Sequence, residues 1–182
     1  MTGDQGRRRD AIDRILDEWA HERPDLDVSA LAVIGRLSRY AALVQARLDA
    51  VFAEHGLQSW EFDVLSALRR SGPAYELTPG ELDRALLITS GTTTHRVQRL
   101  EARGFVTRRR DDEDRRIVRV RLTGTGLAAH EATHDAHAAN ETRILAGLDP
   151  DERDALLGGL QALGRVLGDA TDEVTAMGGD AR

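Results

Sequence analysis

Apolar residues recur at helical spacing over most of this chain. Leu31, Ile34 and Leu37 begin one stripe that continues to Phe52, which predicts a long helix from residue 28 to residue 55. Glycine or proline follows the predicted helices and ends them. The same spacing predicts further helices over residues 10–21, 60–70 and 123–147, and a last one beginning at residue 149.

A shorter helix is predicted immediately before the middle of the chain. Thr78 can cap its N-terminus, Pro79 occupies the first helical position, and Glu81 completes a capping box. We expect this helix to end near Leu86.

A second short helix follows and begins at Thr89 or Ser90. It runs to the residue before Gly104, which suits a left-handed helix end. Thr93, Val97 and Leu100 share one side and are expected to face the core. The other side carries hydroxyl, imidazole and guanidinium groups on Thr92, His95, Arg96 and Arg99. These groups read base edges and bind phosphates in a major groove.

Two strand-like runs, residues 105–110 and 116–122, enclose an acidic tip at residues 111–115. Arginine alternates with valine and leucine in the second run, as expected for a ribbon with one wet face. The acidic tip can brace Arg115 or Arg116 so that a guanidinium projects into a narrow minor groove. Two short helices followed by such a hairpin predict a winged helix-turn-helix. The alternative interpretation is a solvated hairpin whose ion pairs contribute little.

The charge distribution agrees with DNA binding. The chain of 182 residues has a formal net charge of -6, yet residues 84–121 carry +6 and the remainder -12. A basic segment in an acidic chain indicates where a polyanion is bound. The predicted DNA contacts, from the helices and the hairpin together, are Thr78, Ser90, Thr92, Thr93, His95, Arg96, Arg99, Arg109, Arg115 and Arg116.

Composition excludes several other classes of protein. The absence of cysteine excludes disulfides and thiolate metal sites. We find no glycine-rich phosphate loop and no serine in a Gly-x-Ser-x-Gly setting, so we expect neither an enzyme nor a cofactor. No apolar run is long enough for a membrane span, which predicts a cytoplasmic protein.

We expect one domain over residues 1–182, mainly α-helical with a small β wing. Residues 59–123 form its DNA-binding region and residues 171–182 a flexible tail. The apolar stripes in residues 10–55 and 124–170 are too long for a small winged domain to bury. A second copy of the chain is expected to cover them.

The chain resembles the MarR family of bacterial transcriptional regulators. The motifs that carry the resemblance are residues 77–82, Gly91-Thr92, residues 99–106, and residues 114–116 leading to 121–123. The resemblance implies a homodimer, acting as a repressor, whose terminal helices interleave. Its two recognition helices would enter successive major grooves of a palindromic operator, with half-sites about 34–36 Å apart.

The added N-terminal helix resembles the urate-responsive branch of that family, which includes PecS-type and trans-aconitate-responsive regulators. The resemblance implies an effector pocket at Trp19, Asp63, Arg70 and Arg96. Guanidinium groups and an aromatic ring suit a small planar anion such as urate. Binding of that anion would release the operator. Alternatively, Trp19 only attaches the added helix to the core, and Asp63 with Arg70 is a structural ion pair.

Two other functions stay open at this point. His130, His134 and His137 lie on one face of a predicted helix and could bind a metal, although three ligands from one helix rarely converge on one ion. A metal-responsive or effector-independent regulator is therefore one alternative, although we predict no metal site. A metabolite- or partner-binding module without DNA binding is the other.

Overall fold

The computed structural model describes residues 9–111 and 114–169. The chain divides into two compact units, residues 1–140 and 141–182, which are described separately. The predicted flexible tail at 171–182 and the wing-tip residues Asp112 and Glu113 lie outside the described residues.

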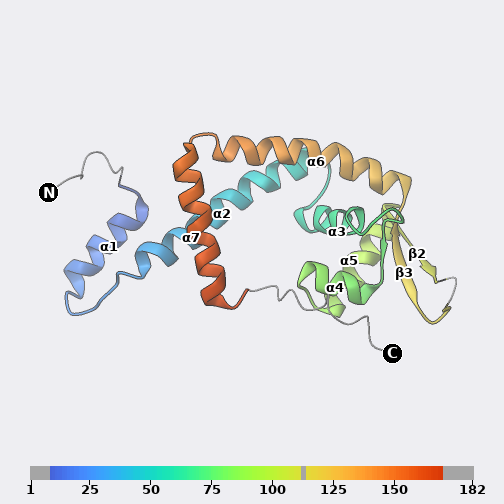
Figure 1. The fold of residues 1–182 in the computed structure, drawn as a ribbon, viewed down its shortest axis with the longest axis horizontal. Helices are drawn as coiled ribbons and strands as arrows, with labels where there is room; N and C mark the ends of the chain where they lie inside the picture. The colour runs from blue at the N-terminus through green and yellow to red at the C-terminus, as the bar shows by residue number, and fades with distance from the viewer. Residues whose placement is uncertain (1–8, 112–113, 170–182) are drawn as a thin grey trace, which may run out of the picture. The chain divides into compact units, whose positions relative to one another are not determined.

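Seven helices and three short strands make up the described residues (Figure 1). In chain order they are α1 (Ala11–Glu22), α2 (Leu31–Glu54), α3 (Ser59–Arg69), β1 (Glu76–Leu77), α4 (Pro79–Leu86), α5 (Ser90–Ala102), β2 (Val106–Arg110), β3 (Val118–Leu122), α6 (Gly124–Leu145) and α7 (Pro150–Leu167). The predicted helices are confirmed, with bounds shifted by a few residues.

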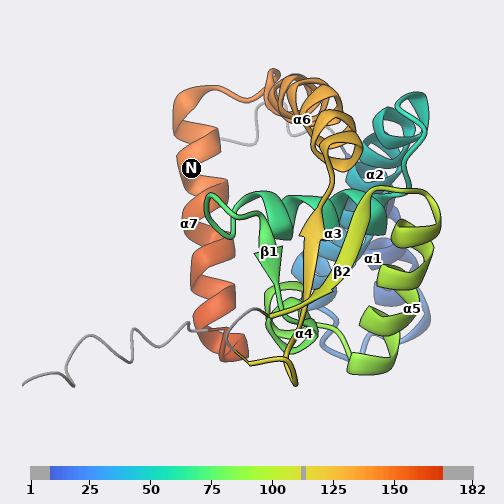
Figure 2. The same cartoon turned by 90° about the vertical axis from the view of Figure 1, so that its right-hand side faces the viewer.

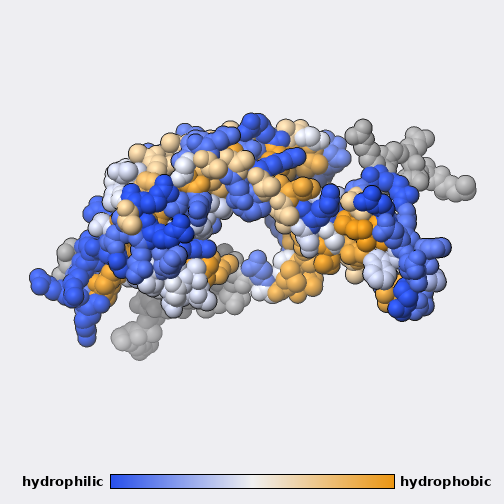
Figure 3. Space-filling view, turned by 180° about the vertical axis from the view of Figure 1, so that it is seen from behind, coloured by the Kyte–Doolittle hydropathy of each residue, from blue (hydrophilic) through white to orange (hydrophobic). Residues whose placement is uncertain are grey.

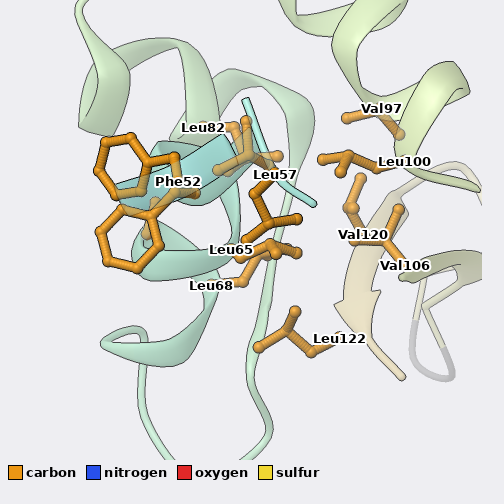
Figure 4. Packing of buried hydrophobic residues seen from close by; sticks show 13 residues of the cluster. Phe52, Leu57, Leu65, Leu68, Leu82, Val97, Leu100, Val106, Val120 and Leu122 are labelled. Carbon is orange, nitrogen blue, oxygen red and sulfur yellow. The ribbon is translucent and has the colours of Figure 1, made fainter. Parts of the chain in front are cut away.

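The core of the first unit surrounds α3. Leu65 and Leu68 of this helix are fully buried, and Leu82 of α4, Leu100 of α5 and Val120 of β3 close around them (Figure 4). Burial of several complete leucine side chains contributes about 1.5–3 kcal/mol each. The helix-turn-helix and the wing therefore share one core.

The helix-turn-helix forms as its caps predict. Thr78 and Glu81 make the capping box of α4, and α5 begins at Ser90. The turn between these helices includes Leu87, whose φ of 53° lies in the left-handed region. Glycine usually occupies such a position. The geometry of this turn could therefore not be predicted from the residue type at position 87.

The wing is a three-stranded antiparallel sheet in the order β1-β3-β2. Thr107 pairs with Arg121 in the hairpin, and Arg121 pairs on its other side with Glu76 of β1. The hairpin is confirmed, but the two-residue strand β1 is too short for a sequence pattern to reveal. Figure 2 shows β2 and α5 as neighbours, consistent with their contacts.

The added helix α1 packs against the N-terminal part of α2. Ile12 is buried beside Gly35, and Arg36 binds Asp10 at 2.8 Å and Asp13 at 2.6 Å. Outside this contact α2 leaves large apolar side chains exposed, including Val33, Ile34 and Leu43. Hydrophobic surface is visible beside α1 in Figure 3.

The second unit contains the end of α6 and the helix α7. Asp149 caps α7 with Glu152, and Gly168 ends it in the left-handed region with φ 75°. None of its residues is buried, and its apolar stripe at Leu156, Leu157 and Leu160 is about half exposed. No helix among the described residues is long and apolar enough to cross a membrane.

Candidate functional site

Helix α5 places one side in the core and the other at the surface. Val97 and Leu100 are buried, whereas Thr92, His95 and Arg99 are exposed. Thr93, which the sequence analysis includes among the DNA contacts, is only 1% exposed. Its hydroxyl has no hydrogen-bond partner among the described residues and faces the interior. The prediction that Thr93 contacts DNA is therefore corrected, because its side chain is buried in the core.

The hydroxyl groups at the helix starts have local partners. Thr78 Oγ1 accepts a bond from the Glu81 amide at 3.3 Å and donates to the Glu81 carboxylate at 2.9 Å. Thr92 Oγ1 lies 3.0 Å from Thr89 Oγ1. Ser90 is exposed. The hydroxyl of Thr78 is therefore used to cap α4. The hydroxyls of Ser90 and Thr92 are more accessible to DNA than that of Thr78.

The wing arginines differ in whether their donors are occupied. Arg109 forms a two-point contact with Glu76, with distances of 2.9 and 3.0 Å. Asp114 binds Arg116 at 3.0 Å while leaving that side chain 91% exposed. Arg115 is exposed, and within the described ranges its guanidinium has no hydrogen bond or ion pair. The expected bracing of a tip arginine is therefore present at Arg116, and Arg115 is the one with open donors.

An ion pair between a buried carboxylate and a partly exposed arginine attaches the end of α5 to α3. Glu61 is 1% exposed, and its carboxylate accepts a bond from Arg103 at 2.5 Å. Arg103 also donates to the Gly56 carbonyl oxygen at 2.9 Å. Removal of one partner from such a pair leaves an uncompensated buried charge. Sequence reasoning missed this contact because Glu61 matches an ordinary capping residue of α3.

Of the other predicted effector residues, Arg96 and Arg70 lie within electrostatic reach of Asp63. Burial raises the pKa of Asp63, and the positive charges of Arg96 and then Arg70 oppose that rise. In the described part of the chain no ion pair within 4.0 Å joins Asp63 to either arginine. The structural ion pair between Asp63 and Arg70 considered from the sequence does not form.

Trp19 lies apart from these three residues within one chain. It is on α1, which contacts the N-terminal part of α2, whereas α3 packs near Phe52 at the other end of α2 (Figure 1). A helix rises about 1.5 Å per residue, so the length of α2 separates the two places. Trp19 is 44% exposed.

An open cleft of about 510 Å³ lies between the end of α3 and α6. Its lining mixes cationic, imidazole and acidic side chains, from Arg69, Arg70, His130, Glu131, His134 and Asp135. Arg69 is engaged by Glu131 at 3.5 Å and lies over the ring of Tyr75. Arg70 has no such contact among the described residues, so its donors are available to an anion.

The three histidines of α6 pack against phenylalanines. His130 stacks on Phe62 with ring centroids 5.3 Å apart, and His137 contacts both Phe52 and Phe62. His130 Nε2 lies 3.1 Å from Ser66 Oγ. Within the described ranges no group of these residues has the geometry to hold a metal ion. Aromatic packing explains the histidine face.

We expect His130 to make the stability of the fold depend on pH. Burial lowers the pKa of His130, and the charges of His134 and Arg69 lower it further while Glu131 opposes them. His130 therefore binds a proton more readily in the unfolded chain than in the folded chain. The free energy of unfolding falls as the pH drops below about 6.5, the ordinary pKa of histidine. Thermal unfolding of His130→Gln should show a smaller loss between about pH 7.5 and 5.5 than wild type.

His95 gives the matched control for this prediction, because it is exposed on α5. His95→Gln should retain the full pH dependence. An unchanged slope in His130→Gln would assign the dependence to other groups.

The fold, the exposed face of α5 and the wing define a winged helix-turn-helix DNA-binding protein. Residues 55–117 match the MarR family. The chain is 40% identical over 150 residues to the HTH-type transcriptional regulator PecS of Dickeya dadantii, covering 81% of this chain and 90% of PecS. The chain therefore belongs to the MarR family of transcriptional regulators, and it is not an enzyme.

Solved structures agree with this assignment. A MarR variant from E. coli complexed with operator DNA aligns with a TM-score of 0.65 and 26% identity, over 76% of this chain and 99% of that one. BpsR of Bordetella bronchiseptica, whose DNA binding is regulated by 6-hydroxynicotinic acid, aligns with a TM-score of 0.63 and 29% identity, over 77% and 96%.

Proposed function

We propose that this protein is a homodimeric repressor that binds a palindromic operator and leaves it when a small planar anion such as urate binds. The observation that supports it most is the cationic face of α5. Arg96 and Arg99 have no hydrogen bond or ion pair among the described residues, and exposed Arg115 on the wing shares this property. Arginines with open donors in a helix and a wing suit the two grooves of duplex DNA.

The exposed apolar side chains support the homodimer. Val33, Ile34 and Leu43 on α2 are at least half exposed, and the stripe of α7 is exposed in the second unit. A soluble monomer rarely leaves such surface uncovered. We therefore assign residues 10–55 and 124–170 to dimerisation and residues 59–123 to DNA binding. Two-fold symmetry then requires half-sites about 34–36 Å apart.

The charges on α3 and α5 support the effector response. Burial raises the pKa of Asp63, whereas the positive charges of Arg96 and Arg70 support its ionised form, without an ion pair to either. An anion that recruits the two arginines would remove this support and move α5, which carries Arg96. Within one chain Trp19 is separated from the other three residues by the length of α2. The proposed effector response therefore depends on Asp63, Arg70 and Arg96. The relative BpsR shows that an aromatic carboxylic acid can regulate DNA binding in this fold.

The ligand must discriminate between two conformations for this mechanism to operate. A ligand shifts an equilibrium only by its differential affinity for the two states. Typical coupling free energies are about 1–3 kcal/mol, which corresponds to about 5- to 150-fold in operator affinity.

A gel-shift titration with the DNA upstream of the protein's own gene tests this function. We expect a retained complex whose affinity falls steeply with salt, because released counterions accompany phosphate contacts. Urate at increasing concentration should then dissociate it, and a zinc chelator should not. No retention at low salt would contradict DNA binding, and release by the chelator would indicate metal control.

Substitution of Asp63 or Arg70 should impair release by urate without impairing operator binding. Asp63→Asn and Arg70→Gln are expected to retain operator binding within about threefold and to need at least about tenfold more urate for release. Asp63→Asn should leave the thermal midpoint unchanged or raise it, because burial penalises the ionised carboxylate.

The control is Asp49→Asn, an exposed carboxylate on α2 that accepts a bond from Gln45. It should respond to urate as wild type does. If both site variants released DNA at wild-type urate concentrations, the pocket assignment would be wrong. A clear loss of stability in Asp63→Asn would instead indicate a structural role.

A further inference from the structure

Trp60 is a partly buried aromatic residue at the start of α3 whose orientation is held from two sides. Its ring packs against the core cluster, and its indole N–H donates to the side-chain oxygen of Gln58. A tryptophan packed on one side and hydrogen-bonded at its polar end presents a fixed ring face. Nothing in the sequence pattern distinguishes it from an ordinary core residue of an amphipathic helix.

The ring of Trp60 receives two arginines of the recognition helix. The guanidinium carbon of Arg99 lies 4.9 Å from the ring centroid, and that of Arg96 lies 5.6 Å from it. The two arginines are three residues apart on α5 and so share one face. Both distances fall within the range of a favourable cation–π interaction, about 6 Å.

This mode of holding an arginine differs from the ion pairs elsewhere in the domain. Arg108 and Arg109 donate to the carboxylates of Glu101 and Glu76. Arg103 donates to Glu61 and also lies over the ring of Phe105. A carboxylate occupies the N–H donors of a guanidinium and cancels its charge locally. An aromatic ring occupies neither, because it interacts with the cation through its π face. Arg96 and Arg99 keep their donors and charge within the described part of the chain.

We propose that Trp60 is a positioning residue for DNA recognition: its ring holds Arg96 and Arg99 in place with donors free for the phosphates or bases of the operator. This inference rests on the proposed DNA contacts of α5. Ordering two long side chains before binding reduces the conformational entropy that the complex would otherwise lose. Trp60 itself need not touch DNA.

Operator affinities of substituted proteins test the proposal. Trp60→Leu should bind about three- to tenfold more weakly than wild type, and Trp60→Phe, which keeps a weaker π face, should lie between them. In an R96Q/R99Q background Trp60→Leu should change affinity less than about 1.5-fold, because the interaction partner is gone.

The controls separate this role from folding and from the proposed function. An equal loss from Trp60→Leu in both backgrounds, or no loss in either, overturns the proposal. In either case the DNA interface would still be supported if wild type binds the operator and R96Q/R99Q binds it more weakly.

A measurement without DNA covers the case in which Trp60→Leu does not fold or wild type does not bind the fragment. In Trp19→Phe the remaining indole is Trp60. Acrylamide quenching of its emission should increase by about half or more when R96Q/R99Q uncovers the ring. Unchanged quenching overturns the contact on which the proposal depends.

Discussion

Replacement of Arg96 and Arg99 together by glutamine is expected to weaken operator binding about a hundredfold at about 0.1 M salt. Each substitution removes a cation and a set of donors that the described residues leave free, and each specific arginine contact contributes about 1–3 kcal/mol. The slope of log affinity against log salt should also fall by up to about 2, since each lost phosphate contact changes it by about 0.9. Fluorescence anisotropy at several salt concentrations measures both quantities.

Arg14→Gln is the matched control for this double substitution. Arg14 lies on α1 with its side chain 75% exposed, and it should leave affinity and salt slope near their wild-type values. The double variant should lower the thermal midpoint only slightly, because neither arginine is buried and each loses one cation–π contact. Wild-type affinity in R96Q/R99Q would show that another surface carries the DNA contacts.

Gly126→Ala is expected to destabilise the protein by about 3 kcal/mol, near the upper end for overpacking. Gly126 is buried in the first turn of α6, and an added Cβ would lie 2.0 Å from the carbonyl oxygen of Phe105. That oxygen already accepts bonds from Thr123, at 3.0 Å from the amide and 3.2 Å from the hydroxyl. The backbone at the base of the wing must therefore move. Thermal unfolding should show a midpoint lower by about 6–12 °C.

Gly124→Ala tests whether the effect is steric. Gly124 begins the same helix, is exposed, and has no atom within 4 Å of its added Cβ. Alanine there should be neutral or slightly stabilising, since it restricts the unfolded chain. Similar midpoints for Gly124→Ala and Gly126→Ala would contradict the predicted clash.

The position of Phe105 gives this clash a functional consequence. Phe105 immediately precedes β2, and Thr123 immediately follows β3, so their hydrogen bonds close the base of the wing. A shift at Gly126 would tilt the hairpin that carries Arg115. We therefore expect Gly126→Ala to lose operator affinity at temperatures where it is still folded.

Local chemistry made the helix-turn-helix predictable. A capping box pairs two side chains three residues apart, and these bind the free backbone amides at the start of a helix. Such pairs start α4, at Thr78 and Glu81, and α7, at Asp149 and Glu152. Both helix starts can therefore be predicted from residues that are close in the sequence. Gly104 has the left-handed φ of 73° expected from its place after α5. The period of the apolar residues likewise placed Val97 and Leu100 in the core.

The turn at Leu87, the strand β1 and the role of Gly126 could not be predicted in this way. Leu87 adopts a left-handed φ although it is neither glycine nor asparagine, so tertiary packing overrides its own preference. The significance of Gly126 depends on the carbonyl of a residue 21 positions earlier, which comes close only in the folded chain.

The candidate site also has features that the sequence predicts and features that only the tertiary structure determines. The sequence alone predicts the helix-turn-helix, the basic charge of α5 and the wing. These features depend on residue types and on spacing between near neighbours in the chain. The sequence could not show which arginines keep open donors. That depends on which carboxylates, such as Glu61 and Glu76, and which ring, that of Trp60, the fold brings into contact with arginines of α5 and the wing. A guanidinium is held or left open by contacts between residues distant along the chain, and only tertiary packing sets those distances.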